Sequence, residues 1–469
     1  MTTGAITQTP ERAGTGTRVA PRGVLFAVVA VALFMSSIDS TIVATALGTI
    51  HRSLHASINW AGWSITIYSL GMVVSLPVSG RISDQFGRRK VFFCGVALFT
   101  AASLACALAS SIFLLIVFRA IQAIGGGALQ PSAAGIVAAS FGKDRDRAIG
   151  LFGTVASGGQ VVGPVIGGLI VGYLSWRWIF FVNVPIGIVL LWAMMRVIPE
   201  SRLGTKSRVD VRGLMLLAGF VFAATFGITQ IGNRGTTFVD PIFLAPVLVG
   251  LVLLVLFVFH TLYSAQPFIP ARLLKARGFA VMNIQNMGWG GVGFGMATLA
   301  PLYAEQRYGL NPLNAGTLLA ARGVGSLAVG AMAALALRRT GYRMPLASGF
   351  ILVAGGMAMM AIAPHWGITP YLWLAVGAGI TGVGNGAANP ASRNACLQVA
   401  PEEVAAISGL RQMFIYIGII FTVSTVTAIL NRSPHPGLTQ AHIMWVAVAL
   451  LLLVMLPLVW RVPEHKGNW

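Results

Sequence analysis

The sequence predicts an all-α integral membrane protein, and three observations carry this prediction. Of the 469 residues, 56% are hydrophobic and only 9% are charged, whereas a soluble globular chain carries about 25% charged residues. Apolar runs of roughly 20 residues, the length that crosses a ~30 Å hydrocarbon core as a helix, recur about fourteen times. Basic residues gather in every second gap between these runs. So few charges could not cover a water-exposed surface, so lipid replaces water around most of the chain.

Each apolar run is expected to form one transmembrane helix. The runs are 23–47, 60–79, 91–109, 112–139, 148–173, 178–198, 213–232, 241–262, 280–303, 313–337, 344–363, 370–392, 404–430 and 441–460. Residues 1–22 lack an apolar core, so they are expected to form a disordered cytoplasmic tail and not a signal peptide. Residues 461–469 are expected to form a second cytoplasmic tail.

The positive charges predict how the chain sits in the membrane. A net charge of +20 could indicate nucleic-acid binding, but the basic residues form no single face or tail, which argues against a nucleic-acid partner. If alternate gaps face opposite sides, one side holds only Arg52, Arg177, Arg234, Arg307 and Arg432, and the other side holds twenty-four basic residues. The positive-inside rule then places both termini in the cytoplasm of a multi-pass plasma-membrane protein.

A weak internal repeat divides the chain into two halves. The stretch Gly125–Ala133 in the fourth run matches Gly384–Ser392 in the twelfth at its glycines and proline, and Gly150-Leu151 matches Gly409-Leu410 at the same offset. Such repeats build many secondary transporters. The sequence therefore predicts six-helix bundles at 23–198 and 280–460, with two inserted helices in the linker 199–279. Coincidence among helices rich in glycine and alanine remains the alternative.

A charged string separates the second and third runs. It spans Gly80–Lys90 and places one carboxylate, Asp84, among four cations, so it could act as an ion-pair latch that holds one face of the protein closed. A plain positive-inside loop is the alternative. The string resembles the signature loop of the major facilitator superfamily, although Ile82 and Gln85 depart from that pattern. The resemblance implies latch roles for Gly80, Asp84, Gly87, Arg88 and Arg89, with Gly87 making the tight turn. A weaker echo without the aspartate lies at Arg338–Arg343.

Two charged residues lie inside apolar runs of the first half. Asp39 is the one acidic residue among twelve that lies well inside a run, and an intramembrane carboxylate is a functional candidate because it is costly to keep there. Arg119, in the fourth run, needs a partner or water for the same reason. The string Ile38–Leu47 resembles the span-one motif of the fourteen-helix drug:proton antiporters. The string Arg119–Gly127 resembles the fourth-helix motif of the superfamily, with Ala123 in place of a glycine. The resemblance implies that Asp39 and Arg119 take part in proton coupling. A structural aspartate bonded to serine or threonine is the alternative.

Glycines and a proline mark the fifth run. Proline removes a helix hydrogen bond and glycine allows close helix contact, so this helix is expected to be kinked and tightly packed. The string resembles the antiporter motif of drug exporters, which favours efflux over uptake, while a generic packing helix is the alternative. The motif residues are Gly159, Gly163, Pro164, Gly167 and Gly168. The following string, Trp176–Gly187, is also similar to the fourteen-helix exporters, and its role is expected to be structural.

Other polar residues inside the runs are candidates for lining a cavity, with hydrogen bonding between helices as the equal alternative. They are Gln122, Asn283, Asn286, Trp289, Arg322, Arg411 and Gln412. The later runs contain no acidic residue, which argues against a strong preference for dicationic substrates. No metal site is expected, because the three cysteines lie far apart and His51 and His55 have no third ligand nearby.

The resemblance and the intramembrane charges together predict the function. We expect a proton-coupled antiporter that works as a monomer without a cofactor, whose two halves alternate access and which exports amphipathic small molecules or drugs. Export of a native metabolite or a lipid by the same fold is the alternative. An intramembrane zinc protease is disfavoured, since the His-Glu-x-x-His string is absent, and the absence of a phosphate-binding loop agrees with transport that needs no ATP. A channel is the remaining alternative, and it would pass substrate without proton exchange.

Overall fold

The computed structural model describes residues 21–141, 145–199, 210–233, 235–264, 267, 269, 278–365, 367–398, 404–462 and 464. The side chain of Asp84 is outside this description, and so are Arg234, nearly all of the first predicted tail and most of the second.

All fourteen predicted runs are helical. In the first half these helices are α1 (Arg22–Ser53), α2 (Ile58–Phe86), α3 (Arg88–Ala107), α4 (Ile112–Phe141), α5 (Arg145–Tyr173), the short α6 (Trp178–Phe181) and α7 (Asn183–Val197). The inserted pair is α8 (Val211–Ile231) and α9 (Pro241–Tyr263). The second half contains α11 (Phe279–Gly288), a π-helix (Trp289–Gly295), α12 (Met296–Thr298), α13 (Ala300–Tyr308), α14 (Pro312–Thr340), α15 (Arg343–Ala361), α16 (Pro370–Leu397), α17 (Val404–Arg432), α18 (Pro436–Leu450), a second π-helix (Leu451–Met455) and α19 (Leu456–Val459).

Eleven of the described helices are long and apolar enough to cross a membrane. The other three predicted spans, 148–173, 280–303 and 370–392, lie in α5, in the segment 279–308 and in α16. Amides and glycines dilute the apolar character of α16, and the segment 279–308 is broken by its π-helix. A helix satisfies its own backbone hydrogen bonds, which is why long apolar runs in lipid adopt this form.

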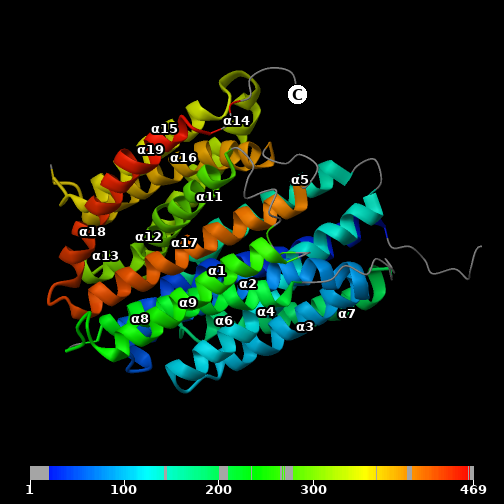
Figure 1. The fold of residues 1–469 in the computed structure, drawn as a ribbon, viewed down its shortest axis with the longest axis horizontal. Coiled ribbons are helices and arrows are strands. Elements are labelled where there is room, and N and C mark those ends of the chain that lie inside the picture. Colours follow the sequence, from blue (N-terminus) through cyan, green and yellow to red (C-terminus); the bar gives the residue numbers. More distant parts are fainter. Residues whose placement is uncertain are drawn as a thin grey trace, which may run out of the picture.

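The helices run side by side along one direction (Figure 1). Helices of the first half, α3, α4, α6 and α7, lie on one flank, and α15, α16, α18 and α19 of the second half lie on the other. Between them, α2 packs on α17 and α5 packs on α14. The inserted α8 contacts both α2 and α17, so it lies along one seam between the halves, while α9 packs on α8 and is mostly exposed.

Local chemistry fixes where several helices begin. The side chains of Ser57, Asn311 and Thr369 accept hydrogen bonds from the first turns of α2, α14 and α16, which is the usual N-cap contact. Gly87 alone joins α2 to α3 with φ of 101°, a backbone conformation that side chains disfavour. The prediction that a tight turn needs Gly87 is confirmed, but most of the string Gly80–Lys90 is helical and not an open loop.

The two ends of the bundle can be named by residues. We call the end at Gly87 the basic face, since Arg81, Arg88 and Lys90 lie there, and the opposite end, where α1 meets α2, the Arg52 face. At the Arg52 face, Arg52 of α1 pairs with Glu305 of α13 at 3.5 Å. This contact joins the first half to the second.

Candidate functional site

Asp39 lies near the middle of α1 and is the centre of a buried polar cluster. Its Oδ2 accepts a hydrogen bond from Nη1 of Arg119 at 2.6 Å. Its Oδ1 accepts from Nε2 of Gln122 at 2.9 Å and from Nδ2 of Asn183 at 3.0 Å. The exposed fraction is 0% for Asp39 and 1% for Arg119. The structure therefore joins the two residues that the sequence places in separate motifs.

Arg119 is held by groups of α1, α2 and α4. Its Nε donates to the carbonyl oxygen of Ser64 at 3.2 Å, and its Nη1 also donates to Oε1 of Gln122 at 2.6 Å. Its guanidinium lies over the ring of Tyr68, with Cζ 4.0 Å from the centroid, and such cation–π contacts stabilise a desolvated charge. Gln122 in turn donates to Oγ of Ser103 at 2.7 Å. Helices α1, α2, α3, α4 and α7 all contribute to this cluster.

The hydrogen-bond pattern fits an ionised Asp39. All three partners are donors, and a carboxylate accepts at both oxygens. A protonated carboxyl would accept more weakly at the oxygen that carries the hydrogen, and that hydrogen would itself need an acceptor. The partners of Asp39 are arginine, glutamine and asparagine side chains, and not the serine or threonine of the alternative interpretation.

Asn183 is the member of this cluster that the sequence analysis missed. It begins α7 and is buried at 1% exposure. The string Trp176–Gly187 contains it, and we expected that string to be structural. The signal was an amide two residues before a proline in an apolar run, which alone does not say what the amide contacts.

The glycine motif of α5 packs directly on the helix that carries Asp39. A Cβ atom at Gly159 would lie 2.7 Å from Cβ of Ser37, and one at Gly163 would lie 3.0 Å from the carbonyl oxygen of Ile38. A Cβ at Gly167 would clash with Thr45. These three glycines are spaced by four residues, so they form one stripe on α5. The expected tight packing is confirmed.

The opposite side of α5 meets the second half. A Cβ at Gly168 would lie 3.1 Å from the carbonyl oxygen of Leu313 in α14, and one at Gly316 would lie 2.7 Å from the carbonyl oxygen of Pro164. Helix α5 is therefore wedged between α1 and α14. No larger side chain fits at either contact without moving backbone.

At the basic face, the latch residues tie helix ends together within the first half. Nη1 of Arg88 donates to the carbonyl oxygen of Gly135 at 2.6 Å, and Nη2 of Arg89 donates to that of Met195 at 3.1 Å. Gly80 packs against Pro131, whose Cβ would lie 3.7 Å from a Cβ at Gly80. Helix α3 is thereby tied to α4 and α7 at this face.

In the second half, the string Arg338–Arg343 contains no aspartate, and Glu464 supplies an acidic group beside it. The backbone N–H of Tyr342 donates to Oε1 of Glu464 at 2.7 Å, and Arg343 pairs with the same carboxylate at 3.6 Å. Arg343 also donates through Nε to the carbonyl oxygen of Val462 at 3.0 Å. Burial raises the pKa of the Tyr342 hydroxyl. The turn between α14 and α15 is thus closed by the segment after α19.

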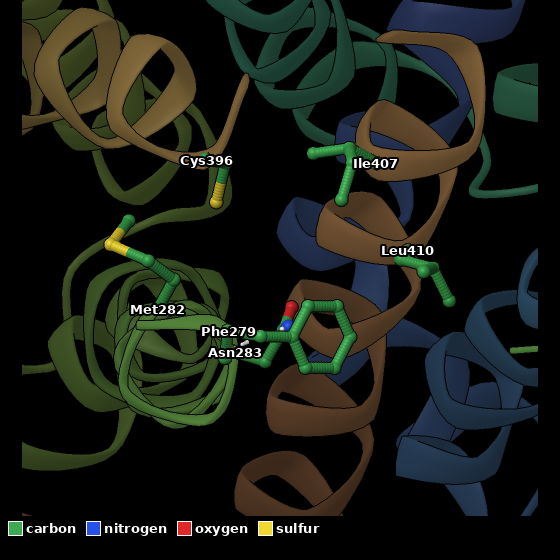
Figure 2. A pocket seen from close by; sticks show the side chains of 6 residues that line it. All are labelled: Phe279, Met282, Asn283, Cys396, Ile407 and Leu410. Atoms are coloured by element: carbon green, nitrogen blue, oxygen red, sulfur yellow. Dashed lines mark hydrogen bonds between the residues drawn. The ribbon is translucent and has the colours of Figure 1, made fainter. Parts of the chain in front are cut away.

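The candidate cavity-lining residues fall into different surroundings. Gln122 belongs to the Asp39 cluster. Asn283 lines a small pocket with Phe279, Met282, Cys396, Ile407 and Leu410, between α11, α16 and α17 (Figure 2).

Two further candidates pack between helices. Asn286 accepts from Ser392 at 2.9 Å and donates to Sγ of Cys396 at 3.2 Å. Trp289 is buried against Phe350, with ring centroids 5.2 Å apart. Asn286 therefore makes hydrogen bonds between α11 and α16, as the alternative interpretation expects.

The two intramembrane arginines of the second half meet only neutral acceptors among the described residues. Nη2 of Arg322 donates to the carbonyl oxygen of Gly293 at 2.6 Å. Nη2 of Arg411 donates to Oδ1 of Asn389 at 2.6 Å. Gln412, beside Arg411 in α17, is half-buried. Within the described ranges, no group of three or more histidine, cysteine, aspartate or glutamate side chains is arranged to hold a metal ion.

Comparison with known proteins places this architecture in a family. The family model "Major Facilitator Superfamily" matches residues 29–423 and 287–469. The chain is 32% identical over 380 residues to the multidrug resistance protein B homolog of Mycobacterium tuberculosis, covering 79% of this chain and 69% of that protein. It is 29% identical over 444 residues to the putative multidrug resistance protein MdtD of Escherichia coli, covering 92% of each chain.

Solved structures agree on the fold. The inward open xylose transporter XylE of E. coli superposes with a TM-score of 0.67 at 14% identity, covering 96% of this chain and 98% of that one. A transporter of the POT family in complex with 5-aminolevulinic acid gives a TM-score of 0.68 at 15% identity, covering 93% and 96%. These identities support the fold alone. The fold, the family match and the relatives agree, and the chain is a membrane-spanning transporter of the major facilitator superfamily.

Proposed function

We propose that this transporter is a proton-coupled antiporter that exports amphipathic small molecules, drugs among them, across the plasma membrane, with both termini in the cytoplasm. The observation that carries the proposal is the cluster of Asp39, Arg119, Gln122 and Asn183. It is the one described place where a carboxylate lies in the middle of an apolar helix. The relatives named as multidrug resistance proteins support the substrate class.

The proposed step at this site is binding and release of one proton by Asp39. The ionised carboxylate satisfies Arg119, Gln122 and Asn183 together. A proton from outside would neutralise Asp39, weaken the ion pair with Arg119 and remove one acceptor position. A buried cation that loses its counter-ion becomes costly, so Arg119 would have to shift toward another partner or toward water. Protonation thereby favours a second arrangement of the first half.

Helix α5 offers the mechanical link to the second half. It packs on the Ser37–Thr45 stretch of α1 through its glycine stripe and on α14 through Gly168. Because closely packed helices cannot deform continuously, a shift of α1 must move α5 or open the contact. The proton site would thus bias which face of the two halves is closed, which is the requirement for alternating access.

The available energy is sufficient for export. Moving one elementary charge across 100 mV yields about 2.3 kcal/mol, which supports roughly a 50-fold concentration ratio of a neutral substrate. Proton entry therefore drives export without a bound nucleotide.

The proposal is tested with purified full-length protein in liposomes that enclose a pH-sensitive dye. A proton gradient is imposed, and proton flux is recorded after lipophilic cations, neutral drugs or amphipathic anions are added. We expect substrate-dependent flux with the unaltered chain and its loss in Asp39→Asn. Asp240→Asn is the matched control, because Asp240 directly precedes α9 outside the predicted spans, and it should keep the flux.

Three outcomes contradict the proposal or revise it. Coupled flux that persists in Asp39→Asn would move the proton site elsewhere. Substrate transport without proton movement would exclude antiport. Absence of flux with the whole panel would favour a native metabolite or lipid as the substrate, which a comparison of spent medium from cells with and without the protein would then identify.

A further inference from the structure

A polar stripe runs along α16, from the middle of the helix toward the basic face. Residues spaced by four, three and four positions share one face of a helix. The stripe consists of Asn385, Asn389, Ser392 and Cys396. Its neighbours are polar groups on other helices of the second half: Asn385 donates to Oγ of Ser326 in α14 at 3.0 Å, and Ser392 donates to Asn286 in α11. Polar groups of two other helices, α14 and α11, therefore face this stripe.

Arg411 is the cation at the centre of the stripe. Its exposed fraction is 8%, and its one hydrogen bond in the described part of the chain is from Nη2 to Oδ1 of Asn389. Its Nε is buried and has no partner among the described groups. An amide oxygen offers a dipole but not a negative charge, so the charge of Arg411 is solvated only in part.

Arg322 is a second, half-buried cation whose described partner is also neutral. It donates to the carbonyl oxygen of Gly293, which lies in the π-helix Trp289–Gly295, where the wider helical turn alters the usual backbone pairing. Its guanidinium Cζ lies 5.1 Å from the ring centroid of Phe294. Its Nε also lacks a partner in the described ranges.

Arg119 of the first half shows what a satisfied intramembrane arginine looks like in this chain. It is paired with a carboxylate at 2.6 Å, and its Nε donates to a carbonyl oxygen at 3.2 Å. The second half cannot repeat this arrangement, because its sequence holds no aspartate or glutamate between Arg307 and Ala400 or between Val404 and Pro463. Glu305 lies at the Arg52 face and pairs with Arg52. Among the described residues, the buried Arg411 and the half-buried Arg322 thus have no carboxylate partner.

We propose that the missing anion is supplied by the substrate: the second half binds the acidic group of an amphipathic molecule, with Arg411 and Asn389 as its main contacts and Arg322 as a second cation. The inference rests on the proposed export function and specifies its substrate class. A guanidinium binds a carboxylate, sulfonate or phosphate through two parallel hydrogen bonds, and the unpartnered Nε of Arg411 provides one of the two donors.

An apolar pocket lies between α11, α16 and α17, the helix that carries Arg411. Phe279 and Met282 of α11 and Ile407 and Leu410 of α17 line it, beside Cys396 of the polar stripe (Figure 2). Leu410 directly precedes Arg411 in α17. Apolar wall and cation therefore occur together, which suits an amphipathic acid better than a hydrophilic one.

The test compares three fluorescent probes that share one dansyl-labelled undecyl chain and differ only in the end group: a carboxylic acid, its primary amide and a trimethylammonium. Binding to the full-length protein in nanodiscs is measured by probe fluorescence. We expect the acid to bind about tenfold more tightly than the amide and the ammonium. Arg411→Gln should remove most of that preference and leave the affinity for the amide unchanged. Arg411→Lys should restore part of it, since lysine keeps the charge but not the planar donor pair.

Arg393→Gln is the matched control, because Arg393 is exposed on α16 and its loss changes the net charge equally. It should keep the preference for the acid. Equal or tighter binding of the ammonium probe, or an unchanged preference in Arg411→Gln, would overturn the inference. If Arg411→Gln does not yield monodisperse protein, Arg322→Gln and the three probes on the unaltered chain decide the question.

The two proposals can fail separately. Selective binding of the acid without any proton flux would refute the antiport mechanism and leave the acid site standing. Proton flux that depends on Asp39 and is driven only by cationic compounds would refute the acid site and leave antiport standing.

Discussion

Thr66 of α2 and Ser424 of α17 lie 3.2 Å apart, hydroxyl to hydroxyl, across the seam between the two halves. Both residues belong to the part of their helices near the Arg52 face, where Arg52 and Glu305 also meet. A buried hydrogen bond between the halves is lost when the halves separate. The Arg52 face is therefore closed in this structure.

Tethering these two positions should stop transport. In a Cys94→Ser background, which removes the exposed native thiol, we expect Thr66→Cys with Ser424→Cys to react with a short, reducible methanethiosulfonate cross-linker. Substrate-driven flux in proteoliposomes should fall to background, because the Arg52 face can no longer open, and a reductant should restore it. Each single cysteine variant is the control. Full transport after complete cross-linking would show that this seam does not open during the cycle.

The glycine stripe on α5 should be sensitive to a single methyl group. Gly159→Ala would place a Cβ 3.0 Å from the carbonyl oxygen of Phe34, and overpacking of this kind costs about 1–3 kcal/mol. We expect a lower Tm in detergent and weaker proton coupling. Gly158→Ala is the matched control, since its Cβ would have only one neighbour, at 3.8 Å. An equal effect of both substitutions would mean that the contact with α1 is not the cause.

The inserted helix α8 should stabilise the protein through Thr229. Nε1 of Trp63 donates to Oγ1 of Thr229 at 2.7 Å, and Nδ2 of Asn59 donates to its carbonyl oxygen. Thr229→Val would leave the Trp63 donor buried and unpaired, which costs about 1–3 kcal/mol. We expect a clear drop in Tm. Thr225→Val, which removes hydrogen bonds only within α8, should have a smaller effect, and the reverse order would contradict the assignment.

Closure of the Arg52 face should depend on pH through Glu305. Burial raises the pKa of this carboxyl and Arg52 partly offsets the rise, while opening the face would expose Glu305 and return its pKa to about 4.3. The closed state then binds the proton more tightly, so it is favoured at low pH and loses this advantage as the pH rises from about 4.3 through the raised pKa.

Cross-linking yield between the two cysteines at positions 66 and 424 reports this closure. It should decrease with rising pH in that window when the reagent's own pH dependence is corrected with an unrelated pair of thiols. Glu305→Gln should make the yield independent of pH there. An unchanged pH profile in Glu305→Gln would assign the effect to another group.

Most of the helical architecture could be predicted from the sequence because lipid leaves the backbone few choices. In lipid, the backbone N–H and C=O groups of an apolar run of twenty residues must pair with one another, which a helix allows. All fourteen predicted runs are accordingly helical, and α14 continues through Arg322. The pairing of Asp39 with Arg119 is different. It depends on how α1 and α4 are rotated and shifted against each other, and neither motif contains that information.

Two further contacts could not be predicted from the sequence for the same reason. Asn183 lies in a string that we expected to be structural, but in the folded chain α7 places its side chain in hydrogen-bond contact with Asp39. Glu464 stands in a polar tail more than a hundred residues after Tyr342, and only the folded chain shows that it caps that turn. Long-range partners of polar side chains need the tertiary structure, since local sequence specifies only the helix on which each one lies.

The position of α8 decides how lipid meets the transporter. Asn431 and Arg432 of α17 donate to carbonyl oxygens of Gly232 and Asn233, just after α8, and α2 is bonded to Thr229. The rings of Phe222 and Phe226 fill the space beside Trp63. Acyl chains are thus kept out of the α2–α17 seam near the Arg52 face. A hydrophobic molecule dissolved in that leaflet therefore cannot enter sideways between the halves through this seam.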